Sequence, residues 1–182
     1  MRKTLWSIIA SALVVGFIIG MIVWQKKQDA RPFNQFDFPE TVEVVNHTDF
    51  KADTMSMVLA HEILGLDTLN LVITYIPDHI NSDELVFLGM IQQIPFKPNQ
   101  FVLLLKKRMS FSQLKTVLSH EFVHIGQYIY GDLTVYPEYA TYAVDTIVFI
   151  EVKYKDRTFE KEAFKQQGRM LKKLNRLLYE TD

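Results

Sequence analysis

The chain of 182 residues contains no cysteine. That absence excludes a disulfide framework, a thiolate nucleophile and a cysteine-rich zinc site, so a metal site here must use His, Asp or Glu. An excess of one charge is also missing, because 20 Lys and Arg face 21 Asp and Glu. A net charge of −1 creates no global basic field, and we expect no nucleic-acid partner.

The composition is that of an ordinary globular protein. Apolar residues make up 48% of the chain and charged residues 23%, which excludes a fully disordered or a collagen-like chain. The length is sufficient for one domain with an appendage.

The apolar residues are concentrated in one run near the N-terminus, Leu5–Trp24. Its 20 residues carry no charge and match the length of a helix that crosses a hydrocarbon core of about 30 Å. The run is too long for the apolar region of a cleaved signal peptide, and no Ala-x-Ala-like cleavage site follows it. We therefore predict a transmembrane signal anchor over residues 1–24, followed by a polar tether over residues 25–40.

The orientation of this anchor follows only from the short segment before it. Lys and Arg flank the run in nearly equal numbers, so the positive-inside rule does not decide. A four-residue tail ahead of a single span usually stays inside, which places the C-terminal domain outside the cytoplasm. We expect a single-pass membrane protein of that orientation.

Gly16 and Gly20 form a GxxxG pattern within the predicted anchor. This spacing lets two membrane helices pack closely, so a homodimer through Gly16 and Gly20 is one interpretation. The alternative is that glycine is simply frequent in membrane helices.

Residues 41–182 are predicted to form one α+β domain. Ser110 and Gln113 have the spacing of a capping box, which opens a helix that ends at Gly131. Pro137 and Thr158 indicate two later helix starts. The expected helices are 50–66, 110–130, 137–154 and 158–179, and the expected strands are 69–76, 85–94 and 101–107. Strands that precede helices favour a segregated α+β fold over alternating βαβ units.

Residues 120–124 read His-Glu-Phe-Val-His within the predicted helix 110–130. His120 and His124 lie one turn apart on the same helix face, so both imidazoles can bind one ion. Glu121 lies about 100° further round the helix, where its carboxylate can reach a water on that ion. Zinc lowers the pKa of such a water toward about 7, and a carboxylate can take its proton. We predict Zn²⁺ bound by His120 and His124, with Glu121 as the general base. Two helix histidines with ordinary hydrogen-bonding partners are the alternative.

The other histidines give no comparable pattern. His61 and Glu62 begin a similar stretch, but Gly65 occupies the position of the second ligand. We expect His47, His61 and His79 to be ordinary polar or capping residues.

Two histidines leave a tetrahedral ion short of one protein ligand beside the open water position. No histidine follows His124 and the chain has no cysteine, so a downstream ligand must be a carboxylate. The candidates are Glu138, Asp145, Glu151, Asp156, Glu160 and Glu162. Periodicity does not choose among them.

The segment HEFVHIGQY and the later segment RTFEKEAF resemble zinc metallopeptidases of the gluzincin type. The shared pattern is His-Glu-x-x-His-x-x-Gln, followed downstream by Phe-Glu-x-Glu-Ala. The second segment is also similar to the Glu-x-x-Ala-Asp helix of membrane-bound zinc peptidases that process prenylated proteins. The resemblance covers residues 101–167 and implies Glu160 as the third ligand, with Ala163 at the small-residue position. Phe164 stands where such proteins often have Asp.

The resemblance also implies a zincin-like fold, in which a small mixed sheet packs on the active-site helix and on C-terminal helices. Such folds place an edge strand along the cleft, where an extended peptide can add by backbone hydrogen bonds. Either predicted strand, 85–94 or 101–107, can serve, and the alternative is that both are plain core strands. Tyr136, Tyr139, Tyr142 and Tyr154 lie between His124 and Glu160, and we assign none of them a role.

Together these patterns predict a membrane-anchored zinc peptidase that hydrolyses peptide or protein substrates. The alternative is a catalytically inactive zincin-fold protein that serves as a binding or scaffolding module at the membrane. The intact Glu121 favours the enzyme, because an inactive descendant often loses its general base.

Overall fold

The computed structural model describes residues 42–77, 88–131 and 133–179. The predicted anchor, the tether, the GxxxG pattern and His79 lie outside these residues. Within the described ranges, no helix has both the length and the apolar character needed to span a bilayer.

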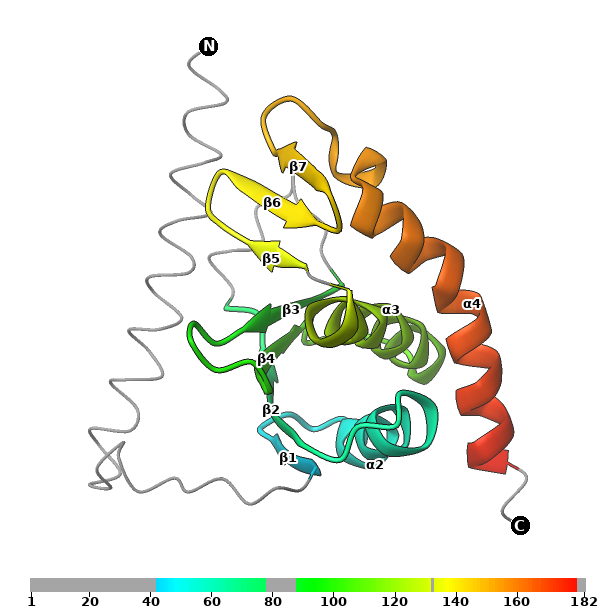
Figure 1. Cartoon of the computed structure of the whole chain (residues 1–182). Helices are drawn as coiled ribbons and strands as arrows, with labels where there is room; N and C mark the ends of the chain where they lie inside the picture. The colour runs from blue at the N-terminus through cyan, green and yellow to red at the C-terminus, as the bar shows by residue number, and fades with distance from the viewer. Residues whose placement is uncertain (1–41, 78–87, 132, 180–182) are drawn as a thin grey trace.

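A four-stranded mixed sheet forms the centre of the fold (Figure 1). Its order is β1 (Val42–Asn46), β2 (Leu69–Tyr75), β4 (Gln100–Leu105) and β3 (Gly89–Gln93). β1, β2 and β4 are parallel, and β3 is antiparallel to β4 at one edge. The central strands β2 and β4 are rich in buried Leu, Val and Ile, as expected of parallel strands covered on both faces.

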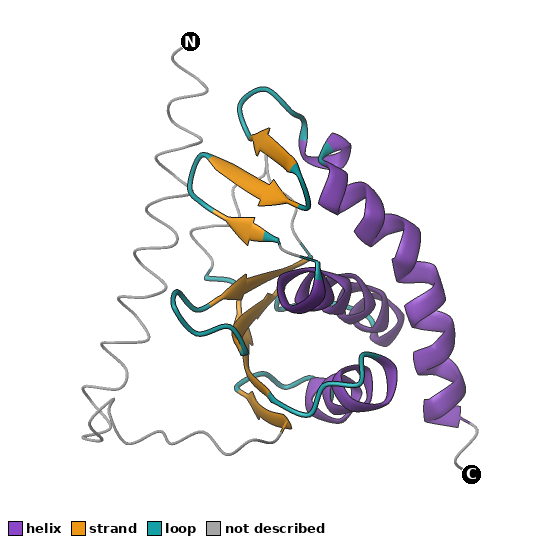
Figure 2. Cartoon of the chain, viewed as in Figure 1, coloured by secondary structure: helices purple, strands orange, loops and turns teal. Residues whose placement is uncertain are grey.

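Helices lie on one side of this sheet, and the last of them packs on the other helices (Figures 1 and 2). The helix α2 (Ala52–Met57) continues into a π-helical segment, η2 (Val58–Ile63), and both lie beside α3 (Phe111–Tyr130). α4 (Thr158–Tyr179) follows a 3₁₀ turn, η4 (Tyr154–Asp156), and packs along α3. The main core joins these layers and includes Leu59, Leu71, Leu103, Phe122 and Leu174.

A second, smaller sheet connects α3 to η4 and α4. It is an antiparallel meander of β5 (Thr134–Val135), β6 (Tyr139–Tyr142) and β7 (Asp145–Val148). Leu133, Ala140, Ile147 and Phe159 form its own apolar cluster.

This meander corrects the predicted helix over residues 137–154. The segment is rich in aromatic and β-branched residues, which favour strands. Tyr142 pairs with Asp145, so Ala143 and Val144 form a two-residue turn, and Ala143 has a φ of 52°. Such turns usually carry Asn or Gly, and the absence of that signal made a helix the simpler prediction.

The order of strands and helices also differs from the prediction. β1 was not predicted, and α2 with η2 connects it to its parallel neighbour β2. The sheet therefore begins with a parallel crossover, so strands and helices are not fully segregated. The helix 110–130 with its capping box, the helix 158–179 and the mixed α+β character are confirmed. The strands expected over 69–76, 85–94 and 101–107 correspond to β2, β3 and β4.

Gly89 allows the edge strand β3 to lie directly against α3. A Cβ at this position would lie 2.3 Å from Cγ1 of Val117 and 3.5 Å from Oε1 of Glu121. Valine within a helix has one strongly preferred rotamer, so Val117 cannot easily turn away. Close approach of β3 to α3 therefore requires glycine here.

We predict that Gly89→Ala destabilises the protein by about 1–3 kcal/mol, the usual cost of overpacking. The matched control is Gly168→Ala in α4, where an added Cβ meets no atom within 4 Å. That change should stabilise the protein by roughly 0.5–1 kcal/mol, because alanine favours a helix over glycine. Chemical unfolding of both variants measures the difference, and equal stability of Gly89→Ala and the parent would contradict the packing argument.

Candidate metal centre

The HExxH segment lies in the most deeply packed part of α3. Every residue from 117 to 125 is buried. Leu118, Phe122 and Ile125 belong to the main core. Phe111, at the start of the helix, is instead 52% exposed. The two histidines are therefore held by a helix that is fixed on several sides.

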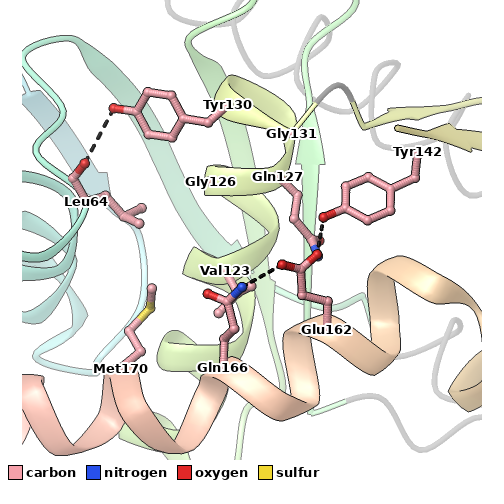
Figure 3. A pocket seen from close by; sticks show the side chains of 10 residues that line it. All are labelled: Leu64, Val123, Gly126, Gln127, Tyr130, Gly131, Tyr142, Glu162, Gln166 and Met170. Atoms are coloured by element: carbon pink, nitrogen blue, oxygen red, sulfur yellow. Dashed lines mark hydrogen bonds between the residues drawn. The ribbon is translucent and has the colours of Figure 1, made fainter. Parts of the chain in front are cut away.

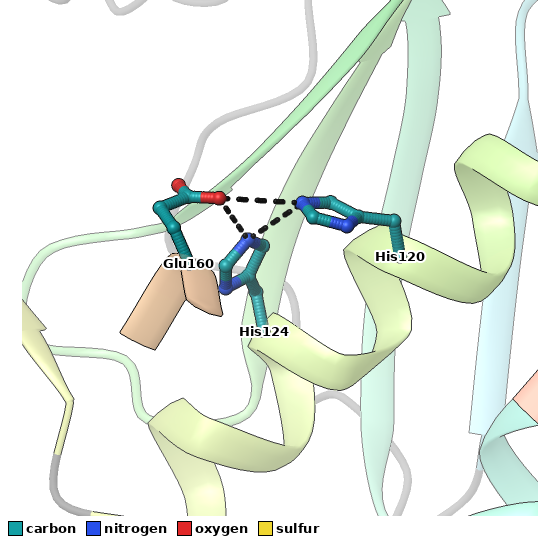
Figure 4. Close-up of side chains that lie close together, drawn as sticks. All are labelled: His120, His124 and Glu160. Atoms are coloured by element: carbon teal, nitrogen blue, oxygen red, sulfur yellow. Dashed lines mark hydrogen bonds and ion pairs between the residues drawn. The ribbon is translucent and has the colours of Figure 1, made fainter. Parts of the chain in front are cut away.

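The structure brings His120, His124 and Glu160 together (Figure 4). α3 provides the two histidines, and the first turn of α4 provides the glutamate. The two Nε2 atoms lie 3.2 Å apart, and each lies 3.4 Å from Oε2 of Glu160. All three residues are at most 7% exposed. We call this group the triad.

Gln127 determines which nitrogen of His124 faces the triad. Its amide Nε2 donates to the carbonyl oxygen of Phe159 at 2.9 Å, so its Oε1 must be the atom that faces Nδ1 of His124 at 2.7 Å. Because an amide oxygen only accepts, Nδ1 of His124 carries the proton and Nε2 presents a lone pair. Oε1 of Gln167 lies 3.1 Å from Nδ1 of His120 and supports the same tautomer there.

The triad therefore consists of three hydrogen-bond acceptors that face one another without a donor. Oε2 of Glu160 is buried and has no hydrogen-bond partner, which is unusual for a buried carboxylate oxygen. Ligands at about 2.0–2.1 Å from a tetrahedral zinc ion are separated by roughly 3.3–3.4 Å. The observed separations of 3.2–3.4 Å match that value. The residues fit a metal ion held by two imidazoles and one carboxylate.

The charges around the triad shift three pKa values. Burial acts to raise the pKa of Glu160, but His120 and His124, followed by Tyr154, lower it to about 2. Burial acts to lower the pKa of His124, but Glu160 and Glu121 raise it above the ordinary 6.5. Burial raises the pKa of Glu121 above 4.5, although both histidines oppose this. The two carboxylates thus favour positive charge at the triad.

Glu121 lies outside the triad and is held by the edge strand. Its Oε2 accepts a hydrogen bond from the backbone N–H of Ile91 at 2.9 Å, and its side chain is buried. Leu88 and Ile94, which flank β3, form backbone hydrogen bonds with Lys106 and Gln100 on the side of β4. Because these groups alternate along an antiparallel strand, the backbone groups of Ile91 point away from β4, to the free edge. Of the two strands proposed to line a cleft, β3 is the edge strand, whereas β4 lies inside the sheet.

The other candidate ligands lie outside the triad. Asp145, Glu138 and Glu151 are exposed around the small sheet, and Asp156 pairs with Lys161 at 3.9 Å. His61 is exposed and lies 3.9 Å from Glu62, and the backbone N–H of His47 donates to Ile73. Among the residues that the structure describes, the triad is the group of this kind that could hold a metal.

Glu162 lies outside the triad and contacts it only through Gln127. It lines a cavity of about 240 Å³ (Figure 3). Its carboxylate accepts hydrogen bonds from the hydroxyl of Tyr142, from Nε2 of Gln166 and from Nε2 of Gln127. Burial, followed by this contact with Glu162, raises the pKa of Tyr142 to about 12. The cavity does not include the triad, and Gln127 separates the two.

Several residues at the site were not predicted from the sequence. Gln127 and Gln167 contact the ring nitrogens of the two histidines. Of the two, only Gln127 belongs to a recognisable sequence pattern, as the Gln of His-x-x-His-x-x-Gln. The ring of Phe164 lies 4.7 Å from that of His120, so it covers the imidazole where the resemblance suggests Asp. Burial and the charges of Glu160 and Glu121 raise the pKa of Tyr154, which keeps this phenol neutral beside the centre.

Comparison of the chain with models of known protein families, with curated proteins and with solved structures found no significant match. The assignment of the centre therefore depends on its own geometry.

We predict that Glu160→Gln and Glu162→Gln affect metal binding very differently. Loss of an outer partner such as Glu162 should lower zinc affinity by about 10–100-fold, whereas loss of a ligand should lower it by more. Both changes remove one negative charge, so Glu162→Gln controls for the general electrostatic effect. Competition with a chelator of known affinity measures both constants. A larger loss in Glu162→Gln would show that Glu160 is not the ligand.

Proposed function

We propose that this protein is a membrane-anchored, zinc-dependent peptidase. The observation that carries the proposal is the convergence of His120, His124 and Glu160, with Glu121 adjacent on the same helix. Two imidazoles and one carboxylate are a known ligand set of catalytic zinc, which keeps a fourth position open. When bound, zinc supplies Lewis-acid polarisation of a carbonyl and activation of water.

Glu121 is the proposed general base. It follows His120 directly, so its carboxylate lies beside the triad without belonging to it. A carboxylate whose pKa is raised by burial is a better proton acceptor near neutral pH. In the proposed reaction, Glu121 takes a proton from the attacking water and then delivers it to the leaving amine. The N–H of Ile91 holds this carboxylate in place.

The edge strand β3 favours a peptide as the substrate. The outer edge of β3 runs beside Glu121, and an extended peptide could pair with the backbone of Gln93 and with the carbonyl oxygen of Ile91, whose N–H is bonded to Glu121. The scissile bond would then lie close to the triad. Backbone pairing of this kind is specific to extended polypeptides, which makes small-molecule substrates a poorer fit.

The predicted anchor places this chemistry at a membrane. The run Leu5–Trp24 and the tether of residues 25–40 would hold the domain close to the bilayer, on its extracytoplasmic side. The pair Gly16 and Gly20 would allow two copies to associate through the anchor.

We predict that Glu121→Gln keeps the fold and the zinc content but loses about 10²–10⁴-fold in peptide hydrolysis, because glutamine cannot accept the proton. The matched control is Glu62→Gln, which alters the exposed His61–Glu62 pair and should retain full activity. The full chain in lipid vesicles should be assayed with soluble peptides and with peptides attached to the bilayer.

Cleavage by Glu121→Gln at the parental rate would contradict the mechanism. If the zinc-loaded parent cleaves neither set of peptides, the alternative of an inactive zincin-fold scaffolding protein is supported instead.

A further inference from the structure

Among the described residues of α4, the outer face carries mostly positive charge, and Glu162 is the partly exposed acidic residue within its arc. Glu160 is buried in the triad, and the carboxylate of Glu162 is bonded to Tyr142, Gln127 and Gln166. All the basic residues of this helix are exposed. They are Lys161, Lys165, Arg169, Lys172, Lys173 and Arg176, and we call them the cationic stripe.

These six residues fall on one side of the helix. At about 100° per residue they occupy an arc of roughly 120°, opposite the face that buries Phe159, Ala163, Met170 and Leu174. From the first to the last, the stripe is about 22 Å long. Within the stripe, Lys161 has an acidic neighbour on the preceding turn, Asp156, at 3.9 Å.

The stripe reflects a separation of charge along the chain. Residues 153–179 contain nine Lys and Arg against three Asp and Glu, a net charge of +6. The whole chain has a net charge of −1, so the remaining residues carry −7. The near-neutral total thus hides a local basic surface, which would attract an anionic partner.

Two exposed aromatic side chains lie beside the C-terminal end of the stripe. Phe111 is 52% exposed and Tyr179 is 62% exposed. The ammonium group of Lys115 lies 5.1 Å from the ring centre of Phe111 and 5.2 Å from that of Tyr179, so the two rings are neighbours. Exposed aromatic rings next to a basic helix face are typical of helices that lie on a membrane surface.

We propose that the cationic stripe binds the anionic phospholipid surface of the membrane in which the chain is anchored. This inference rests on the anchor that belongs to the proposed function. A random-coil chain of the length of the predicted tether would span about 20–25 Å, so the stripe would bind the lipid surface intramolecularly, at a high effective concentration. Polybasic segments near a bilayer bind anionic lipids in this way.

The consequence concerns the orientation of the metal centre. Glu160 belongs to the same helix as the stripe, on its buried side. A contact between the outer face of α4 and the lipid fixes the height and the tilt of the triad above the bilayer. Substrates would then be selected by the distance of their cleavage site from the membrane.

The absence of native cysteine permits a direct test. A single Gly168→Cys change places a fluorescent label among the stripe residues, at an exposed position with no atom within 4 Å of the new Cβ. Val45→Cys places the control label on the exposed surface of β1, at the other end of the sheet from β3. Both full-length proteins are reconstituted into zwitterionic vesicles and into vesicles with about 30% phosphatidylglycerol, each with nitroxide-labelled lipid as a quencher.

We expect the label at Gly168, and not the label at Val45, to be quenched in the anionic vesicles. The quenching should disappear in about 0.5 M NaCl, where the Debye length is roughly 4 Å. Combining Lys165→Gln, Arg169→Gln and Lys172→Gln should lower the lipid association constant of the stripe by on the order of 100-fold. The zinc content should stay at the parental value, since these residues lie outside the triad.

Equal quenching in both kinds of vesicle, or no effect of the triple change, would overturn the proposal. If the protein stays bound to anionic vesicles but dissociates from zwitterionic vesicles, the predicted membrane anchor is wrong and lipid binding by the stripe is supported. Duplex DNA serves as a competing anionic probe. If DNA changes the label signal at salt concentrations at which anionic vesicles do not, the stripe binds nucleic acid and the lipid assignment is wrong.

Discussion

The candidate site depends on one electrostatic constraint, which is the convergence of three acceptor atoms in a buried place. Nε2 of His120, Nε2 of His124 and Oε2 of Glu160 lie 3.2–3.4 Å apart, and the tautomers supported by Gln127 and Gln167 leave no proton among them. Burial makes such an arrangement costly unless a cation or a proton compensates it. The raised pKa of His124 and the strongly lowered pKa of Glu160 are two expressions of this demand.

The rest of the fold supports that convergence. The helical spacing of α3 aligns the two imidazoles, while packing of α4 along α3 delivers Glu160. Gln127 connects the two helices at the ligands, because it contacts His124 and the carbonyl that precedes Glu160. The edge strand completes the site by holding Glu121, and Gly89 permits its close approach. The positions of the triad and of Glu121 are thus set by separate parts of the structure.

The sequence predicted the parts of the site that depend on local spacing. The capping box at Ser110 and the i, i+4 histidines were enough to predict α3 and two of the three triad residues. Glu160 followed only from a resemblance, because the intervening residues fold as a sheet whose Ala143–Val144 turn lacks the usual turn residues. The contact of Ile91 with Glu121 could not be predicted, since a backbone N–H leaves no mark in the sequence.

Zinc-edge X-ray absorption on the purified full chain would show whether the triad is a zinc site. We expect one zinc per chain, with two imidazole nitrogens and a carboxylate oxygen among ligands at about 2.0–2.2 Å. A variant that combines His120→Ala with His124→Ala should contain none. An unchanged zinc content and absorption spectrum in that variant, or a metal-free parent after purification with excess zinc, would show that the triad does not bind zinc.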